Sequence, residues 1–146
     1  MNPAFFSDNT ALLALLERWA EHGWLRALDV AFASFLARET PDAPPLLVLA
    51  AALASHQLGR GHACLDLAHT LADPGFALSL PPEGADNSAE PLPLPAAVLD
   101  GVSLADWQRA LAAESVLVAV NQRVQSWSTP LADGDEVAFF PPVTGG

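Results

Sequence analysis

The chain of 146 residues contains no lysine and only six basic residues, all arginine, against 17 acidic residues. The resulting formal net charge of −11 repels phosphate, which argues against direct binding of nucleic acid or of an anionic membrane. The absence of lysine also excludes a complete Walker A phosphate-binding loop and a Schiff-base enzyme, because both require that side chain. The composition therefore favours protein partners over nucleic acid or membrane.

Cysteine and long hydrophobic runs are also scarce. The single Cys64 has no second thiol for an internal disulfide, which is typical of a reducing compartment. The longest apolar run, 46–54, is about half the length that a transmembrane helix needs, and no basic region with an apolar stretch marks a signal peptide at the N-terminus. We therefore expect a cytoplasmic protein, and its apolar fraction of 51% is enough for a buried core.

Helical periodicity dominates the first seventy residues. The run 46–58 is apolar almost all round, which predicts a buried central helix, and a short helix is expected at about 64–71. Two earlier helices are predicted to bury one apolar face each. The predicted buried residues are Leu12, Leu15, Leu16 and Trp19 in the first of these helices and Leu28, Phe32, Phe35 and Leu36 in the second.

The composition changes after residue 72. Segment 73–95 is rich in proline and predicts a solvated loop, after which Ser103 is expected to cap a helix over 104–113. Beyond it, 116–120, 123–127 and 136–140 have strand character. The predicted fold class is therefore α+β, with a small helical bundle followed by strands.

Four ordered segments in the first 113 residues carry a resemblance to a known family. They are 25–33 (LRALDVAFA), 50–56 (AAALASH), 59–67 (GRGHACLDL) and 104–107 (LADW). In this order they resemble the N-terminal domain of the exodeoxyribonuclease V alpha subunit, a DNA-repair helicase. The resemblance implies a helical docking module that binds the gamma subunit, without the helicase motor of that family.

A second resemblance lies in the last 31 residues. Segments 118–122 (VAVNQ) and 130–146 (PLADGDEVAFFPPVTGG) resemble the C-terminal part of the molybdopterin synthase small subunit. That family has a ubiquitin-like β-grasp fold and carries sulfur as a thiocarboxylate on its terminal glycine. The hairpin that opens a β-grasp domain is not recognisable in this sequence, so the resemblance implies a partial β-grasp with a flexible diglycine tail.

The second resemblance implies a role for Gly146. An adenylating enzyme would activate its carboxylate with ATP, a sulfur donor would form the thiocarboxylate, and the large synthase subunit would accept the tail for molybdenum cofactor biosynthesis. The chain itself would bind no cofactor. The residues implied to contact these partners are Phe139, Phe140, Pro141, Pro142, Val143, Thr144 and Gly145. From the residues alone, the tail could equally be a frayed chain end, and Phe139 and Phe140 could both be buried.

The two resemblances meet near residue 115 without a linker. We therefore predict a helical docking domain over 1–115, including the proline-rich loop 73–95, and a β-grasp-like segment over 116–146. Such an abrupt junction indicates a fusion, a recombined reading frame or an engineered chimera.

His56, His62, Cys64 and His69 form the one group of possible metal ligands that the sequence suggests. Their spacing matches no standard zinc site, so structural histidines and a buried thiol are the favoured interpretation, and no metal is predicted. No catalytic motif surrounds any nucleophile, which indicates a carrier or adaptor subunit and not a stand-alone enzyme. The sulfur carrier is the preferred hypothesis, and a docking module with the strands as a fusion remnant is the alternative.

Overall fold

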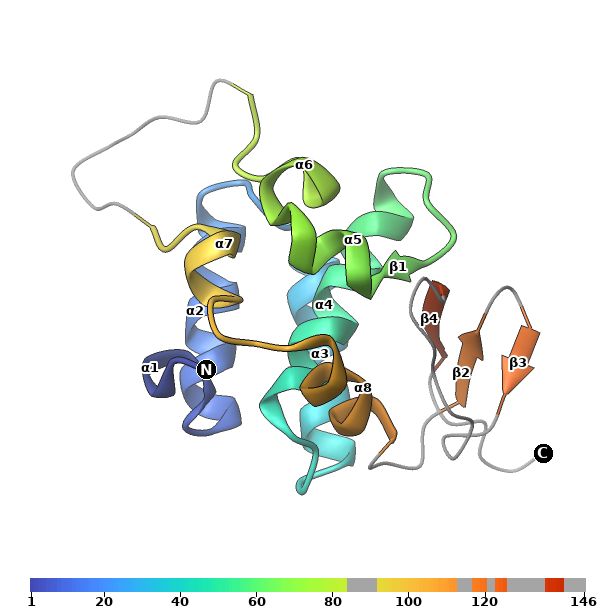
Figure 1. Ribbon diagram of the computed structural model, residues 1–146. Helices are drawn as coiled ribbons and strands as arrows, with labels where there is room; N and C mark the ends of the chain where they lie inside the picture. The colour runs from blue at the N-terminus through green and yellow to red at the C-terminus, as the bar shows by residue number, and fades with distance from the viewer. Residues whose placement is uncertain (84–91, 113–116, 121–122, 126–135, 141–146) are drawn as a thin grey trace.

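A computed structural model of the protein describes residues 1–83, 92–112, 117–120, 123–125 and 136–140 (Figure 1). The helices in these ranges are α1 (Pro3–Phe6), α2 (Asn9–Glu21), α3 (Ala27–Glu39), α4 (Pro45–Gly59), α5 (Leu67–Ala72), α6 (Pro74–Leu78), α7 (Pro95–Val98) and α8 (Leu104–Ala112). The strands are β1 (Leu65–Asp66), β2 (Leu117–Val120), β3 (Arg123–Gln125) and β4 (Glu136–Phe140).

Helix α4 is the centre of the helical part, as the sequence predicts. Every residue from Leu46 to Ala54 is buried, and α4 contacts α2, α3, α6 and α8 (Figure 1). The Trp107 indole of α8 is fully buried and donates a hydrogen bond of 3.1 Å to the carbonyl of Leu46. No helix in the described residues is long and apolar enough to cross a membrane.

Helix α2 also follows its prediction. The Asp8 carboxylate caps it by accepting a hydrogen bond of 2.7 Å from the amide of Ala11. All four predicted core side chains are buried, and the Trp19 indole donates to the carbonyl of Pro93 over 3.0 Å. This bond holds the segment that precedes α7 against α2.

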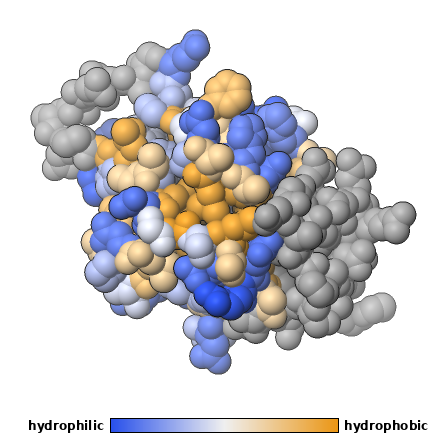
Figure 2. Space-filling view, in the orientation of Figure 1, coloured by the Kyte–Doolittle hydropathy of each residue, from blue (hydrophilic) through white to orange (hydrophobic). Residues whose placement is uncertain are grey.

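Hydrophobic surface is visible in the middle of the face that carries α7 and α8 (Figure 2).

The prediction for the buried face of α3 is wrong in part. Leu36 is buried as expected, but Leu28 is 62% exposed and Phe35 is 37% exposed. The buried face instead contains Val30, Ala33 and the fully buried Asp29. The helix is rotated relative to the prediction because its acidic residue has hydrogen-bond partners in the interior, described below.

Two segments between α4 and α7 differ from the expectation. The predicted helix at 64–71 is divided into β1 and α5, and the Asp66 side chain caps α5 by accepting from the amide of His69. Within the predicted loop 73–95, α6 is helical, and Leu78 and Leu80 are buried. Helix α6 forms because Asp73 caps its first turn and because side chains from α4 bind its last carbonyls.

The strands form one antiparallel sheet in the order β1-β4-β2-β3. Val118 of β2 is opposite Phe139 of β4, and Leu65 of β1 is opposite Val137. Strand β4 also contacts α4. The predicted strands after residue 115 therefore agree with β2, β3 and β4, whereas β1 joins this sheet from the helical part of the chain.

Candidate functional site

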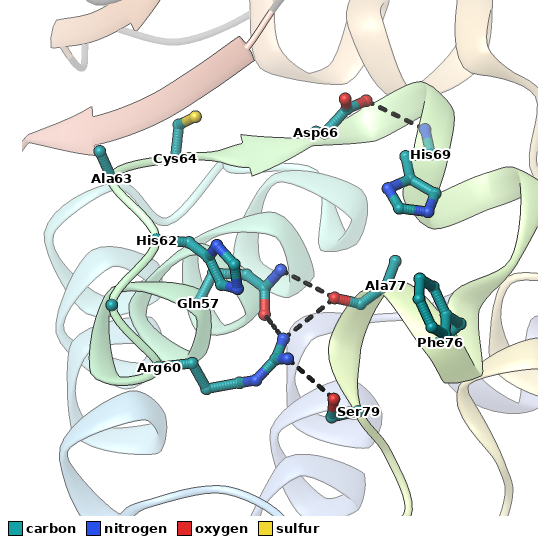
Figure 3. A pocket seen from close by; sticks show the side chains of 11 residues that line it. Gln57, Arg60, His62, Ala63, Cys64, Asp66, His69, Phe76, Ala77 and Ser79 are labelled. Carbon is teal, nitrogen blue, oxygen red and sulfur yellow. Dashed lines mark hydrogen bonds between the residues drawn. The ribbon is translucent and has the colours of Figure 1, made fainter.

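A hollow of about 500 Å³ lies between the C-terminal end of α4, the segment that leads into β1, and α6 (Figure 3). Arg60 donates hydrogen bonds to the side chain of Gln57 over 2.6 Å and to the Ala77 carbonyl over 3.0 Å. It also donates to the Ser79 hydroxyl over 2.8 Å, and Gln57 donates to the same Ala77 carbonyl over 2.9 Å. The polar wall of the hollow therefore holds α6 onto α4.

The four possible metal ligands of the sequence are not gathered into a metal site. His62, Cys64 and His69 line the hollow, whereas the Nε2 of His56 donates to the Leu78 carbonyl over 2.8 Å. Burial lowers the pKa of His56 below its ordinary value, so its imidazole is neutral at neutral pH. Among the described residues, no three His, Cys, Asp or Glu side chains are placed to hold a metal ion.

A second polar cluster joins the start of α3 to the end of α4. The fully buried Asp29 accepts hydrogen bonds of 2.9 Å and 2.8 Å from the main-chain amide and the guanidinium of Arg26. The Ser55 hydroxyl donates to the same carboxylate over 2.6 Å, and Arg26 also donates to the Ser55 carbonyl over 2.8 Å. The guanidinium lies so close to Gly59 that a Cβ atom there would be 2.5 Å from its central carbon.

The Asp29 cluster was not predicted from the sequence. The signal was present, because an acidic residue at the third position of a helix can accept from the amide of the N-cap residue. Since every oxygen of the carboxylate has a donor, the burial of this charge is compensated. The cluster fixes the rotation of α3 about its axis.

This rotation exposes an apolar stripe on α3, which consists of Leu28, Phe32 and Phe35. Leu28 and Phe35 are exposed and Phe32 is half-buried, and the three residues share one helix face by their spacing. Beside α3, a shallow hollow of about 380 Å³ separates it from α2. The residues that line the hollow are Glu17, Ala20, Glu21, Ala27, Val30, Ala31 and Ser34.

The predicted carrier residues are described only in part. Phe139 and Phe140 are the last residues of β4 and pair with Val118 and Leu117 of β2. The end of β4 at Phe140 agrees with the two prolines that follow it, because proline cannot donate to a ladder. The remaining predicted site residues lie outside the described residues: Pro141, Pro142, Val143, Thr144, Gly145 and Gly146.

Comparison with known proteins gives similarities to two families. The family described as "RecBCD enzyme subunit RecD, N-terminal domain" matches residues 21–134. The molybdopterin synthase sulfur carrier subunit of Escherichia coli (strain K12) is 62% identical over 40 residues, and that of Haemophilus influenzae is 50% identical over 40 residues. These 40 residues are 27% of this chain and 49% of each relative, so the chain spans about half the length of these relatives. No solved structure matches the chain significantly.

The two similarities overlap in the sequence. Only 20 residues precede the first match and 12 follow it, so a similarity over 40 residues must share positions with it. The boundary at 115/116 therefore stays a prediction, while both resemblances of the sequence analysis are confirmed and are consistent with a fusion. Because the first match covers more than three quarters of the chain, the protein belongs to the family of N-terminal domains of the RecBCD enzyme subunit RecD.

Proposed function

We propose that the protein is a docking module that binds another subunit of a RecBCD-type nuclease complex. The observation that carries this proposal is the apolar stripe on α3, presented by a helical part whose own core is already filled around α4. A helix that is buried on one face and apolar on the opposite face has the character of a contact surface. Membership of the family supports the same function.

The gamma subunit of exodeoxyribonuclease V is the partner that tests this function. We expect the purified full chain to bind the gamma subunit, measured by isothermal titration calorimetry. The chain should not bind duplex or single-stranded DNA under the same conditions, because its net charge of −11 offers no basic surface. The docking function is wrong if calorimetry detects no binding to the gamma subunit at concentrations up to about 100 μM, where specific complexes are normally detected.

A second function, a sulfur-carrier tail, is favoured by the identity of 62% to a sulfur carrier subunit over 40 residues. The antiparallel strands β2, β3 and β4 directly precede the segment with the two glycines, so an anchored stem for the tail is available. We propose that Gly146 is adenylated and converted to a thiocarboxylate, with Phe139 and Phe140 near the partner surface. The molybdopterin synthase large subunit and an activating enzyme would be the partners.

The carrier function has its own test. Incubation with ATP, a sulfur donor and a molybdopterin-type activating enzyme should exchange one carboxylate oxygen for sulfur, a gain of about 16 Da in the intact mass. A variant that lacks Gly146 should show no gain and should keep the helical circular dichroism of the unchanged chain. A folded chain that stays at its unmodified mass contradicts the carrier function and leaves the docking function intact.

A further inference from the structure

Two of the three side chains of the stripe on α3 are exposed, and the third, Phe32, is half-buried and packs against the core. Leu28 is 62% exposed and Phe35 is 37% exposed, although leucine and phenylalanine are among the residues most often found in protein interiors. The opposite face of the same helix packs on α2 and α4. Leu28 and Phe35 are therefore surface residues, because the core side of α3 is already filled by Val30, Ala33 and Leu36.

The position of the stripe is fixed from inside the molecule. Asp29 follows Leu28 directly, and its carboxylate is held by Arg26 and by Ser55 of α4. A rotation of α3 that buried Leu28 would break the hydrogen bonds that join Asp29 and Arg26 to Ser55 of α4, and this is unfavourable because the Ser55 hydroxyl would lose its acceptor. The apolar face is thus presented in one orientation, which lowers the entropy that a partner must overcome on binding.

The surroundings of the stripe indicate the charge of its partner. The shallow hollow between α2 and α3 contains Glu17 and Glu21, one helical turn apart on α2, and both are exposed. Neither carboxylate takes part in a salt bridge within the residues that the structure describes. A cationic side chain from a partner would find there two carboxylates without a salt bridge. Ala31 lines the hollow and lies three or four residues from Leu28 and Phe35, so the hollow borders the stripe on α3.

The same charge distribution argues against a second copy of this chain as the occupant. Two copies would each bring a formal net charge of −11, and a symmetric contact would place the Glu17 and Glu21 pairs of both copies near one interface. A partner segment that is apolar on one side and carries arginine or lysine at its edge satisfies both features of the surface.

We propose that the stripe Leu28, Phe32 and Phe35, together with Glu17 and Glu21, is the docking surface for a basic amphipathic helix of the partner subunit. Its apolar side chains cover the stripe, and one cationic side chain enters the hollow between α2 and α3. This inference rests on the proposed docking function and names the surface and the chemistry of the partner.

The test uses the full chain and the gamma subunit, with binding measured by isothermal titration calorimetry. The double variant Leu28→Glu/Phe35→Gln removes the two exposed side chains of the apolar stripe and should weaken binding roughly tenfold or more, because such truncations at the centre of an interface are the costly ones. Its matched control, Phe76→Glu/Leu94→Gln, removes two other exposed apolar side chains, on α6 and before α7, and should bind like the unchanged chain. Circular dichroism and thermal unfolding establish that both variants are folded.

A second pair of variants tests the charge. Glu17→Gln/Glu21→Gln should weaken binding and reduce its dependence on salt concentration. The control Glu83→Gln/Asp100→Asn removes two charges elsewhere on the surface and should leave both properties unchanged. If each test pair binds as its control pair does, the assigned surface is wrong even though the docking function stands.

Two other outcomes overturn the proposal. If the unchanged chain does not bind the gamma subunit, the docking function fails and the surface assignment fails with it. If sedimentation equilibrium shows a dimer of the unchanged chain that the Leu28→Glu/Phe35→Gln variant abolishes, the occupant of the stripe is a second copy and not a basic helix.

Discussion

The helical part and the C-terminal strands are ordered by different means. In the helical part, backbone hydrogen bonds are satisfied within each helix, and a large set of buried side chains surrounds α4. Strands β2, β3 and β4 depend instead on pairing between segments, and the outer neighbour of β4 is β1, which the helical part supplies. This difference implies that the stability of the strands depends on the helical part more than the stability of the helical part depends on the strands.

The largest effect is expected from a change at the centre of the helical part. Trp107→Ala removes a fully buried indole and its hydrogen bond to Leu46, so it should lower the free energy of unfolding by about 4 kcal/mol. Urea unfolding followed by far-UV circular dichroism measures this loss. Phe76→Ala, at a residue that is 74% exposed, is the control and should change stability by less than about 0.5 kcal/mol. Equal losses for the two variants would contradict the assigned core.

The next effect comes from the buried carboxylate. Asp29→Ala leaves the amide of Arg26 and the hydroxyl of Ser55 without their acceptor. We therefore expect the free energy of unfolding to fall by about 2 kcal/mol. The charge attraction between Arg26 and Asp29 contributes little to this change, because the Arg26 side chain is 48% exposed and solvent screens it.

Gly59→Ala should act through the same cluster, since its Cβ would force the Arg26 guanidinium away from Asp29. The Asp29→Ala/Gly59→Ala double variant should therefore lose less stability than the sum of the two single losses. Additive losses would show that Gly59 and Asp29 are independent.

A shortened chain tests whether the helical part is stable without the C-terminal strands. In a chain that ends at Ala112, β1 and α4 no longer have β4 as a neighbour. We expect the helical part of this chain to fold, with a free energy of unfolding lowered by about 1 kcal/mol. Near-UV circular dichroism should retain the signals of Trp19 and Trp107, which are both buried. Loss of cooperative unfolding in the shortened chain would show that the dependence is mutual.

The smallest effect is expected from the titration of one histidine. Because burial lowers the pKa of His56 in the folded protein, the unfolded chain binds a proton at higher pH than the folded chain does. Stability should therefore fall as the pH drops below about 6.5, the ordinary histidine value, until the lowered pKa is reached. His56→Gln can still donate to the Leu78 carbonyl, and this variant should reduce the pH dependence in that range. If the stability of the His56→Gln variant varies with pH as that of the unchanged chain does, groups other than His56 cause the pH dependence.

Periodicity and capping predicted much of the helical part from the sequence. The central helix was evident because 46–58 is apolar on all sides, and α2 and α8 have capping residues in front of an apolar face. The face of α3 was assigned incorrectly because the prediction placed the largest apolar residues inside. The decisive feature is a charge with partners on another helix, and sequence spacing along one helix does not report those partners.

The elements that the sequence analysis did not predict are held in place by residues that lie far away in the sequence. Strand β1 has only two residues, and it is defined by its pairing with β4, about seventy positions later. Helix α6 lies in a proline-rich segment and is held by His56 and Gln57 of α4 and by Arg60, the C-cap residue of α4. Strand β4 ends at Phe140, as the sequence predicts, whereas 141–146 lie outside the described residues. The partner-binding role of Phe139 and Phe140 stays a prediction.

The pairing of β1 with β4 also bears on aggregation. An exposed edge strand presents an open row of amides and carbonyls, which is a template for the addition of another chain. In the described sheet, both edges of β4 are occupied, and the outermost strands are β1 with two residues and β3 with three. Such short edges offer few sites for intermolecular pairing, so the helical part protects the C-terminal strands from self-association as well as supporting them.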